Sequence, residues 1–196
     1  MKPRAAALAV AVSVFGCGGP PAQPWTPAPD VGARWSSTLA AWTRRGEAYE
    51  AFEGRLFATA TCLSPSLTNG WLRERAAREG WSPARLESEL ASTAERARTT
   101  LGIVLGVTAQ DARWNDAAPG GTLEMTLTVD GAERPARLSR KLTEDELGDL
   151  VPYFTWITPL HAGYLLEFDA PSPTSNLALR VAGPPARVEM RWDLPR

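Results

Sequence analysis

The chain is poor in the side chains that most enzymes and metal sites use. It holds one histidine, His161, and two cysteines, Cys17 and Cys62, among 196 residues. Multi-histidine metal centres and Ser-His-Asp relays need histidine, so either would have to be built around this single ring. His161 stands just before a strand-like segment, without a carboxylate at helical spacing. A surface or capping histidine is therefore the plainer interpretation, and we expect no metal or cofactor site.

Recognised enzyme motifs are absent as well. The sequence contains no G-x-S-x-G nucleophile turn, no phosphate-binding glycine loop and no H-E-x-x-H zinc motif. Cys62 lies in the apolar run LFATATCLS, and the nearest basic residue along the chain is Arg55. A nucleophilic thiol needs a close neighbour that lowers its pKa. We therefore expect Cys62 to be a small buried hydrophobe, and we assign no catalytic residue.

Positive charge is scarce once the N-terminal segment is set aside. The whole chain has 21 basic and 22 acidic residues, and Lys2 and Arg4 belong to its first four positions. Without these two, 19 basic residues face 22 acidic ones, a net charge near −3. Binding to nucleic acids rests on concentrated positive charge, so we expect no nucleic-acid partner.

The N-terminal segment has the organisation of a secretory signal. Residues 1–4 form a short basic head, and residues 5–15 are apolar except for Ser13. A helix that crosses a bilayer needs about 20 apolar residues, so this run is too short to be a membrane anchor. We expect residues 1–16 to be a signal peptide that is removed from the mature protein.

The end of this signal, Val14-Phe15-Gly16-Cys17, resembles the lipobox of bacterial lipoprotein precursors. An aliphatic residue stands three positions before the cysteine and a small residue directly before it, although Phe15 fills a place where a smaller residue is usual. The resemblance implies lipidation of Cys17 with acyl chains such as palmitate, and a membrane anchor at the mature N-terminus. Gly18 stands where aspartate often marks inner-membrane retention, which implies the outer membrane, facing the periplasm. Exposure on the cell surface stays open, as does an ordinary secretory signal with an incidental cysteine.

A proline-rich tether follows the lipidation site. Five prolines and two glycines lie between positions 18 and 30, which leaves too few backbone donors for a helix or a sheet. We expect residues 17–30 to hold the protein at a distance from the membrane. Residues 31–196 are enough for a single globular domain with a sizeable core.

Alternating hydrophobicity predicts strands in the second half. Residues 122–130 (TLEMTLTVD) and 187–194 (RVEMRWDL) alternate apolar and polar side chains, and Asp130-Gly131 predicts a tight hairpin turn into residues 132–140. Further strands are expected at residues 49–63, 101–109, 163–169 and 176–182. About seven strands with turns between them favour an antiparallel, immunoglobulin-like β-sandwich.

Helices are expected to interrupt this mainly β pattern. Ser82-Pro83 has the form of an N-cap followed by proline in the first turn, and Gly80 has the form of a helix end. Residues 66–98 therefore predict a helical hairpin inserted between two strands. Thr143 and Glu146 have the spacing of a capping box, which predicts a third, short helix.

One loop has an unusual composition for a connection between strands. Trp114, Asn115 and Asp116 combine a large apolar ring with two short polar side chains, and loops at the ends of sandwiches often carry binding functions. Together with Asp111 they could also supply oxygen ligands to calcium, but the spacing matches no known calcium loop. The plainer alternative is that Asn and Asp only organise turns. We single out Trp114, Asn115 and Asp116 as the predicted binding loop.

Three functions of different classes fit these observations. A lipid-anchored, non-catalytic binding or interaction module, with an envelope protein as its partner, fits the signal, tether and sandwich. A hydrolase acting on envelope material would need an acid/base pair that the sequence does not suggest. A carbohydrate-binding module would need two exposed, coplanar rings among the eight tryptophans, most of which we expect in the core.

Overall fold

The computed structural model describes residues 33–169 and 176–192. In these residues the chain is mainly β, as the sequence predicts, with two antiparallel sheets accompanied by four α-helices. The expected signal peptide, the lipidation site Cys17 and the tether lie outside the described residues. None of the helices in the described ranges is long and apolar enough to cross a membrane.

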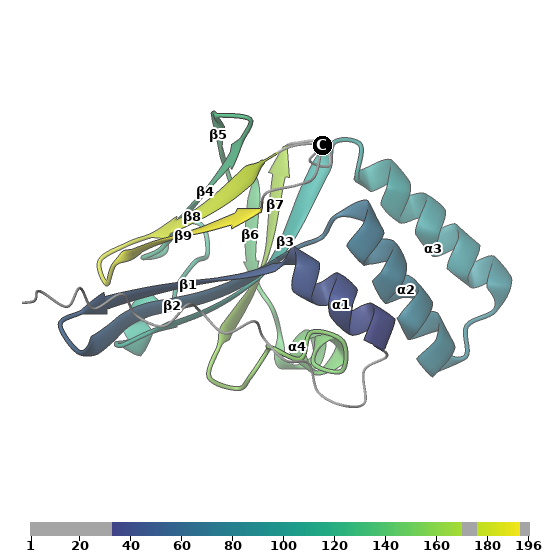
Figure 1. Cartoon of the computed structure of the whole chain (residues 1–196), viewed down its shortest axis with the longest axis horizontal. Coiled ribbons are helices and arrows are strands. Elements are labelled where there is room, and N and C mark those ends of the chain that lie inside the picture. The colour runs from purple at the N-terminus through teal and green to yellow at the C-terminus, as the bar shows by residue number, and fades with distance from the viewer. Residues whose placement is uncertain (1–32, 170–175, 193–196) are drawn as a thin grey trace, which may run out of the picture.

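The strands form one five-stranded and one four-stranded sheet (Figure 1). In the larger sheet the order is β1 (Thr43–Glu50), β2 (Glu53–Cys62), β3 (Thr100–Ala109), β7 (Ala162–Asp169) and β6 (Leu138–Lys141). In the smaller sheet it is β5 (Ala132–Pro135), β4 (Glu124–Val129), β8 (Leu177–Ala182) and β9 (Arg187–Trp192).

The main core lies between the two sheets. Strand β9 buries Val188, Met190 and Trp192 and exposes the charged residues between them, which confirms the predicted alternation. Facing side chains of β2, β3, β4, β7 and β8 complete one cluster of buried residues. Because both sheets contribute to this cluster, they pack as a sandwich.

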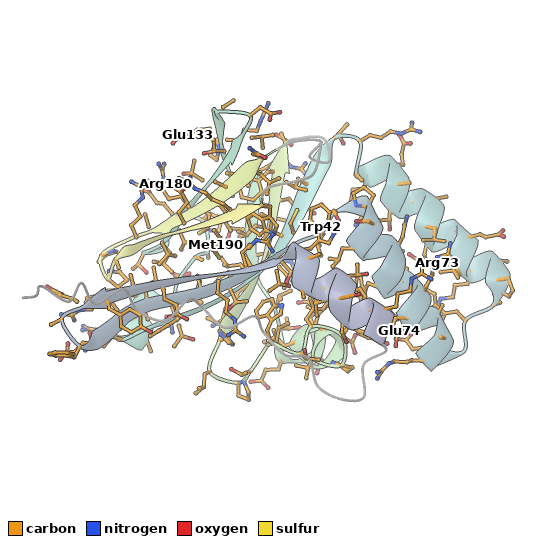
Figure 2. All side chains as sticks on the ribbon, in the orientation of Figure 1. Trp42, Arg73, Glu74, Glu133, Arg180 and Met190 are labelled. Atoms are coloured by element: carbon orange, nitrogen blue, oxygen red, sulfur yellow. The ribbon has the colours of Figure 1, made fainter. Side chains whose placement is uncertain are left out.

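The sandwich is joined at one edge by β1 and β9. The Arg44 Nε–H donates to the Arg191 carbonyl at 2.9 Å, and the Trp192 indole N–H donates to the Trp42 carbonyl at 2.8 Å. Trp42, labelled in Figure 2, packs against the core between the sheets and also against a second core beneath the helices. Trp42 therefore connects the core between the sheets with the core beneath the helices.

Helices cover the outer face of the five-stranded sheet. They are α1 (Ala33–Trp42), α2 (Pro65–Glu79), α3 (Pro83–Arg96) and α4 (Glu144–Leu150). Trp35 and Leu39 of α1 and Leu67 of α2 pack with Val104 of β3 in the second core. Figure 1 shows α2 and α3 side by side, with α3 on the outside. Consistent with this position, α3 has no buried residue.

Several local predictions are confirmed. Asp130 and Gly131 have φ values of 51° and 83°, as the tight turn between β4 and β5 requires. Thr143 and Glu146 form both hydrogen bonds of the capping box at the start of α4. Ser82 caps α3, and Gly80 ends α2 with a φ of 66°.

Other boundaries were wrong. Residues 132–140 were expected to form one strand, but the chain leaves β5 at Pro135 and enters β6, in the other sheet, at Leu138. Tyr49 was placed in the same strand as Cys62, whereas it belongs to β1. Alternation shows which side chains face inward, but it does not show where a strand changes sheets.

The immunoglobulin-like arrangement is not confirmed. Immunoglobulin constant domains pair their strands in the orders A-B-E-D and C-F-G. Here the larger sheet begins with three consecutive strands, β1-β2-β3, and continues through β7 and β6. The sequence pattern identifies strands, but neighbour relations across the sheet depend on long-range packing that the pattern does not contain.

Candidate functional site

A groove opens between the helices and the outer face of the five-stranded sheet. Its volume is about 350 Å³, within the range of small-molecule sites. The walls come from α2, α3, α4 and the segment that follows α4, and the floor comes from β3 and β7. We call this hollow the α2–α4 groove. The larger apolar residues of its lining are Leu63, Trp71, Val104, Leu142, Leu150, Phe154 and Leu165.

The floor of the groove is made by paired residues of two interior strands. Val104 of β3 lies opposite Leu165 of β7, and Gly102 lies opposite Glu167 in the same register. These side chains point away from the sandwich core because their neighbours in each strand point into it. The sequence signal for this floor is a β3 strand that is apolar on both of its faces.

The α2 wall follows from helical periodicity. Thr68, Trp71 and Arg75 are three and four positions apart, so they share one face of the helix. The Ser64 hydroxyl accepts a hydrogen bond from the Leu67 N–H at 3.2 Å and caps the start of α2, with Pro65 in its first turn. This cap fixes where the groove-facing residues begin.

Trp71 is the largest side chain of that wall. Its ring meets Tyr153 and Phe154 edge to face, with centroid distances of 6.4 Å and 5.8 Å. Its indole N–H is buried and has no acceptor among the described residues. The Arg75 guanidinium lies 5.9 Å from the centroid of this ring and 5.4 Å from that of Trp81. Trp71 thus packs against the segment after α4 and also lines the groove.

The α4 wall is held by a charged pair. Arg140 of β6 donates two hydrogen bonds of 2.8 Å to the Glu146 carboxylate, which also accepts from the Thr143 N–H. The bond from Arg140 and then the bond from Thr143 lower the pKa of Glu146 to about 2. Glu146 therefore stays ionised across the physiological range, and it ties α4 to the edge of the sheet.

Most charged residues of the groove have partners within the chain. Arg75 pairs with Glu79, Arg140 with Glu146, and Glu167 with Arg137, at N–O distances of 2.6 to 2.8 Å. Two charges remain without a partner among the described residues, namely Arg96 of α3 and Asp149 of α4. They come from two different helices of the groove wall.

A second hollow, of about 420 Å³, lies beside His161 on the outer face of β1, β2 and β3. The His161 ring meets Trp156 edge to face at 5.9 Å, and its Nδ1 accepts a hydrogen bond from the Thr158 N–H. Burial, and then the nearby charge of Arg45, lower the pKa of His161. The ring is therefore neutral near pH 7 and closes a turn, which agrees with the capping interpretation.

The residues of the predicted binding loop make hydrogen bonds and packing contacts within the chain. The Asn115 side-chain carbonyl accepts from the Ala109 N–H at 2.5 Å, and its backbone carbonyl accepts from the Tyr164 hydroxyl at 2.6 Å. Asp116 accepts from the Ala118 N–H, and Trp114 packs half-buried against the sandwich core. These contacts are those of a loop that organises turns. A binding role for Trp114, Asn115 and Asp116 stays a prediction.

The calcium alternative has no additional support from the described residues. The Asp111 carboxylate pairs with Arg113, which lowers the pKa of Asp111, and no group of three or more metal-ligating side chains occurs in the described ranges. The free thiol of Cys62 is fully buried, as expected.

The described tryptophans do not form an exposed pair. Trp35, Trp156 and Trp192 are buried, and Trp42, Trp71, Trp81 and Trp114 are half-buried. Trp25 lies outside the described residues.

No protein-family model, curated protein or solved structure matches this chain. The α2–α4 groove is therefore judged on its geometry alone. Its residues come from segments spread between positions 63 and 167, which no motif in the sequence connects.

Proposed function

We propose that the mature chain is a lipid-anchored, non-catalytic binding module of the bacterial envelope, and that its ligand site is the α2–α4 groove. The lipobox-like end of the signal supports lipidation at Cys17. The tether at residues 17–30 would give the domain reach from the outer membrane into the periplasm. In this proposal α2 and α3 act together as the helical hairpin predicted over residues 66–98.

The lining of the groove is the observation that carries the proposal. Ligand sites are concave, mostly apolar and provided with a few polar groups that orient the ligand. The α2–α4 groove has a mostly apolar lining, and among its charged residues Arg96 and Asp149 have no described partner. The second hollow, by comparison, is closed on one side by a histidine already engaged in a turn.

The groove supports binding better than hydrolysis. A carboxylic acid that protonates a leaving group needs a raised pKa, but the pKa of Glu146 is lowered to about 2 by Arg140. Glu167 is held in an ion pair with Arg137, which also pairs with Asp169, so its carboxylate is already engaged within the chain. The sugar-binding alternative lacks the exposed tryptophan pair that it requires among the described residues.

An envelope protein could contact the domain at a separate surface. Tyr49 and Phe52 at the tip of the β1–β2 hairpin and Leu160 are large apolar side chains with high exposure. Figure 1 shows this hairpin on the opposite side of the molecule from α3. A partner bound there would leave the groove free.

The groove is tested with N-phenyl-1-naphthylamine, a neutral apolar fluorophore whose emission rises when it leaves water. We expect the purified soluble domain to bind this probe, and Leu165→Arg to abolish binding because the charge enters the apolar floor. Leu150→Arg, in the α4 wall, is a second variant. Leu160→Arg is the matched control, since Leu160 is 78% exposed and outside the groove.

Thermal unfolding verifies that each variant is folded. Unchanged probe binding in folded Leu165→Arg and Leu150→Arg proteins would contradict the assignment of the groove as the ligand site.

A further inference from the structure

We infer that the α2–α4 groove takes one acyl chain of a zwitterionic amphiphile, whose anionic group lies at Arg96 and whose cationic group lies at Asp149. This inference rests on the proposed function, because it names the ligand class of the same groove. A phosphoethanolamine head on a hydrocarbon chain has this chemistry.

The apolar lining fits a flexible chain. Leu63 and Leu165 lie along the sheet side and Trp71 lies on the helix side, each partly buried, while Val104 and Phe154 are buried in the second core behind them. Gly102 adds no side chain to the floor, and Leu63 covers it, with its Cδ1 3.1 Å from the place a Cβ would take, so the path for a ligand runs over Leu63 and Leu165. An acyl chain can adapt its torsions to such a path, and it gains affinity with each methylene that leaves water.

The charges around the groove select the head group. Three of the charged residues in the lining are basic, namely Arg75, Arg96 and Arg140, and three are acidic, namely Glu146, Asp149 and Glu167. A head with one net charge would therefore meet as much repulsion as attraction. Arg96 and Asp149 have no described partner, so they can each pair with one end of a zwitterion.

A peptide strand is a poorer occupant for the same groove. Strand addition needs a free sheet edge with unpaired backbone groups. The floor strand β3 is paired with β2 on one side and β7 on the other, and β7 is paired with β6. The floor therefore offers side chains to a ligand and no free backbone ladder.

The experiment displaces bound N-phenyl-1-naphthylamine with single-chain compounds, used below the concentrations at which they form micelles. Three compounds carry the same twelve-carbon chain: a lysophosphatidylethanolamine, a fatty acid and an alkyltrimethylammonium. We expect the zwitterion to displace the probe at concentrations about two- to fivefold lower than either singly charged compound, the range for exposed ion pairs. Shortening its chain by one methylene should weaken displacement about fourfold.

Uncharged variants test whether Arg96 and Asp149 bind the two ends of the head group. Arg96→Gln and Asp149→Asn should each weaken displacement by the zwitterion about two- to fivefold, after correction for the affinity of each variant for the probe. Arg98→Gln is the matched control, because Arg98 pairs with Glu95 and lies outside the groove lining. Its displacement curves should equal those of the parent.

The outcomes distinguish a failure of this inference from a failure of the proposed function on which it rests. If the probe binds and Leu165→Arg abolishes binding, but the three head groups displace equally or the chain length has no effect, the ligand class is wrong and the groove stands. If Arg96→Gln and Asp149→Asn behave like Arg98→Gln, the placement of the head group is overturned. If the probe does not bind the parent protein, both proposals fail.

Discussion

The Cys62 thiol lies on the inward face of β2, fully buried within the core between the two sheets. Burial raises its pKa from an ordinary value near 9 to about 12, against a smaller opposing effect of the Arg44 charge. The thiol is therefore protonated at neutral pH and unreactive as a nucleophile. The absence of a basic neighbour in the sequence predicted this state.

The raised pKa predicts how the stability depends on pH. Below about pH 9 the thiol is protonated in both the folded and the unfolded chain, so the stabilising effect is fully present. This effect is lost as the pH rises toward 12, because the unfolded chain releases the proton first. Between about pH 8 and pH 10 the free energy of unfolding should fall by about 1 kcal/mol more in the parent than in Cys62→Ala. Urea unfolding of both proteins measures the difference. Equal losses would mean that the thiol titrates alike in both states.

The sequence alone does not explain why position 106 on the outer face of β3 is a glycine. A Cβ at Gly106 would lie 2.7 Å from the Trp156 ring, which is held by a hydrogen bond from its indole N–H to the Thr61 hydroxyl. The glycine is thus required by a side chain that is distant along the chain. Only the packing of the segment after α4 onto β3 explains it.

At the scale of elements, local chemistry determines α4. Its capping box is readable from Thr143 and Glu146 alone, because both hydrogen bonds join residues three positions apart. This short helix forms one wall of the groove, so its stability also affects the site.

Thr143→Ala should lower the free energy of unfolding by about 1 kcal/mol, because the Glu146 N–H loses its acceptor at the helix start. Thr143→Ser keeps the hydroxyl and should stay close to the parent. Chemical denaturation compares the three proteins. A loss in the serine variant as large as in the alanine variant would show that the methyl group, and not the cap, matters.

Elements without a local hydrophobic pattern in the sequence were not predicted. Strand β1 has the sequence TRRGEAYE, in which only Gly46 is buried, so hydrophobic alternation could not identify it. Its place at the edge of the sheet, next to β9, explains this polarity. Helix α1 buries Trp35 and Leu39 against residues far along the chain, which the sequence alone does not pair with it.

At the scale of the whole molecule, the sequence predicted the mainly β class but not the candidate site. The groove forms where α2, α3 and α4 meet β3 and β7, and these contacts join residues that are up to about a hundred positions apart. The predicted binding loop had an unusual local composition, yet Asn115 and Asp116 use their polar groups to hold the loop. Composition indicates a turn or a site equally well, whereas only the fold shows a concave surface.

The proposed anchor makes a prediction about the complete protein in a bacterial host. Mature protein should begin at Cys17 and carry acyl chains, so mass spectrometry should find an N-terminal peptide that begins at Cys17 and carries the added mass of the lipid. Cys17→Ser should remain unprocessed and lose the lipid. An unmodified Cys17, or a mature N-terminus elsewhere, would contradict the lipoprotein assignment.

The most direct test of the central claim is amide hydrogen exchange of the soluble domain with and without N-phenyl-1-naphthylamine, measured by peptide mass spectrometry. The account predicts slower exchange in α2 and α4, which wall the groove, and unchanged exchange at residues 110–122, which contain the predicted binding loop. Protection confined to residues 110–122, with α2 and α4 unaffected, would contradict it.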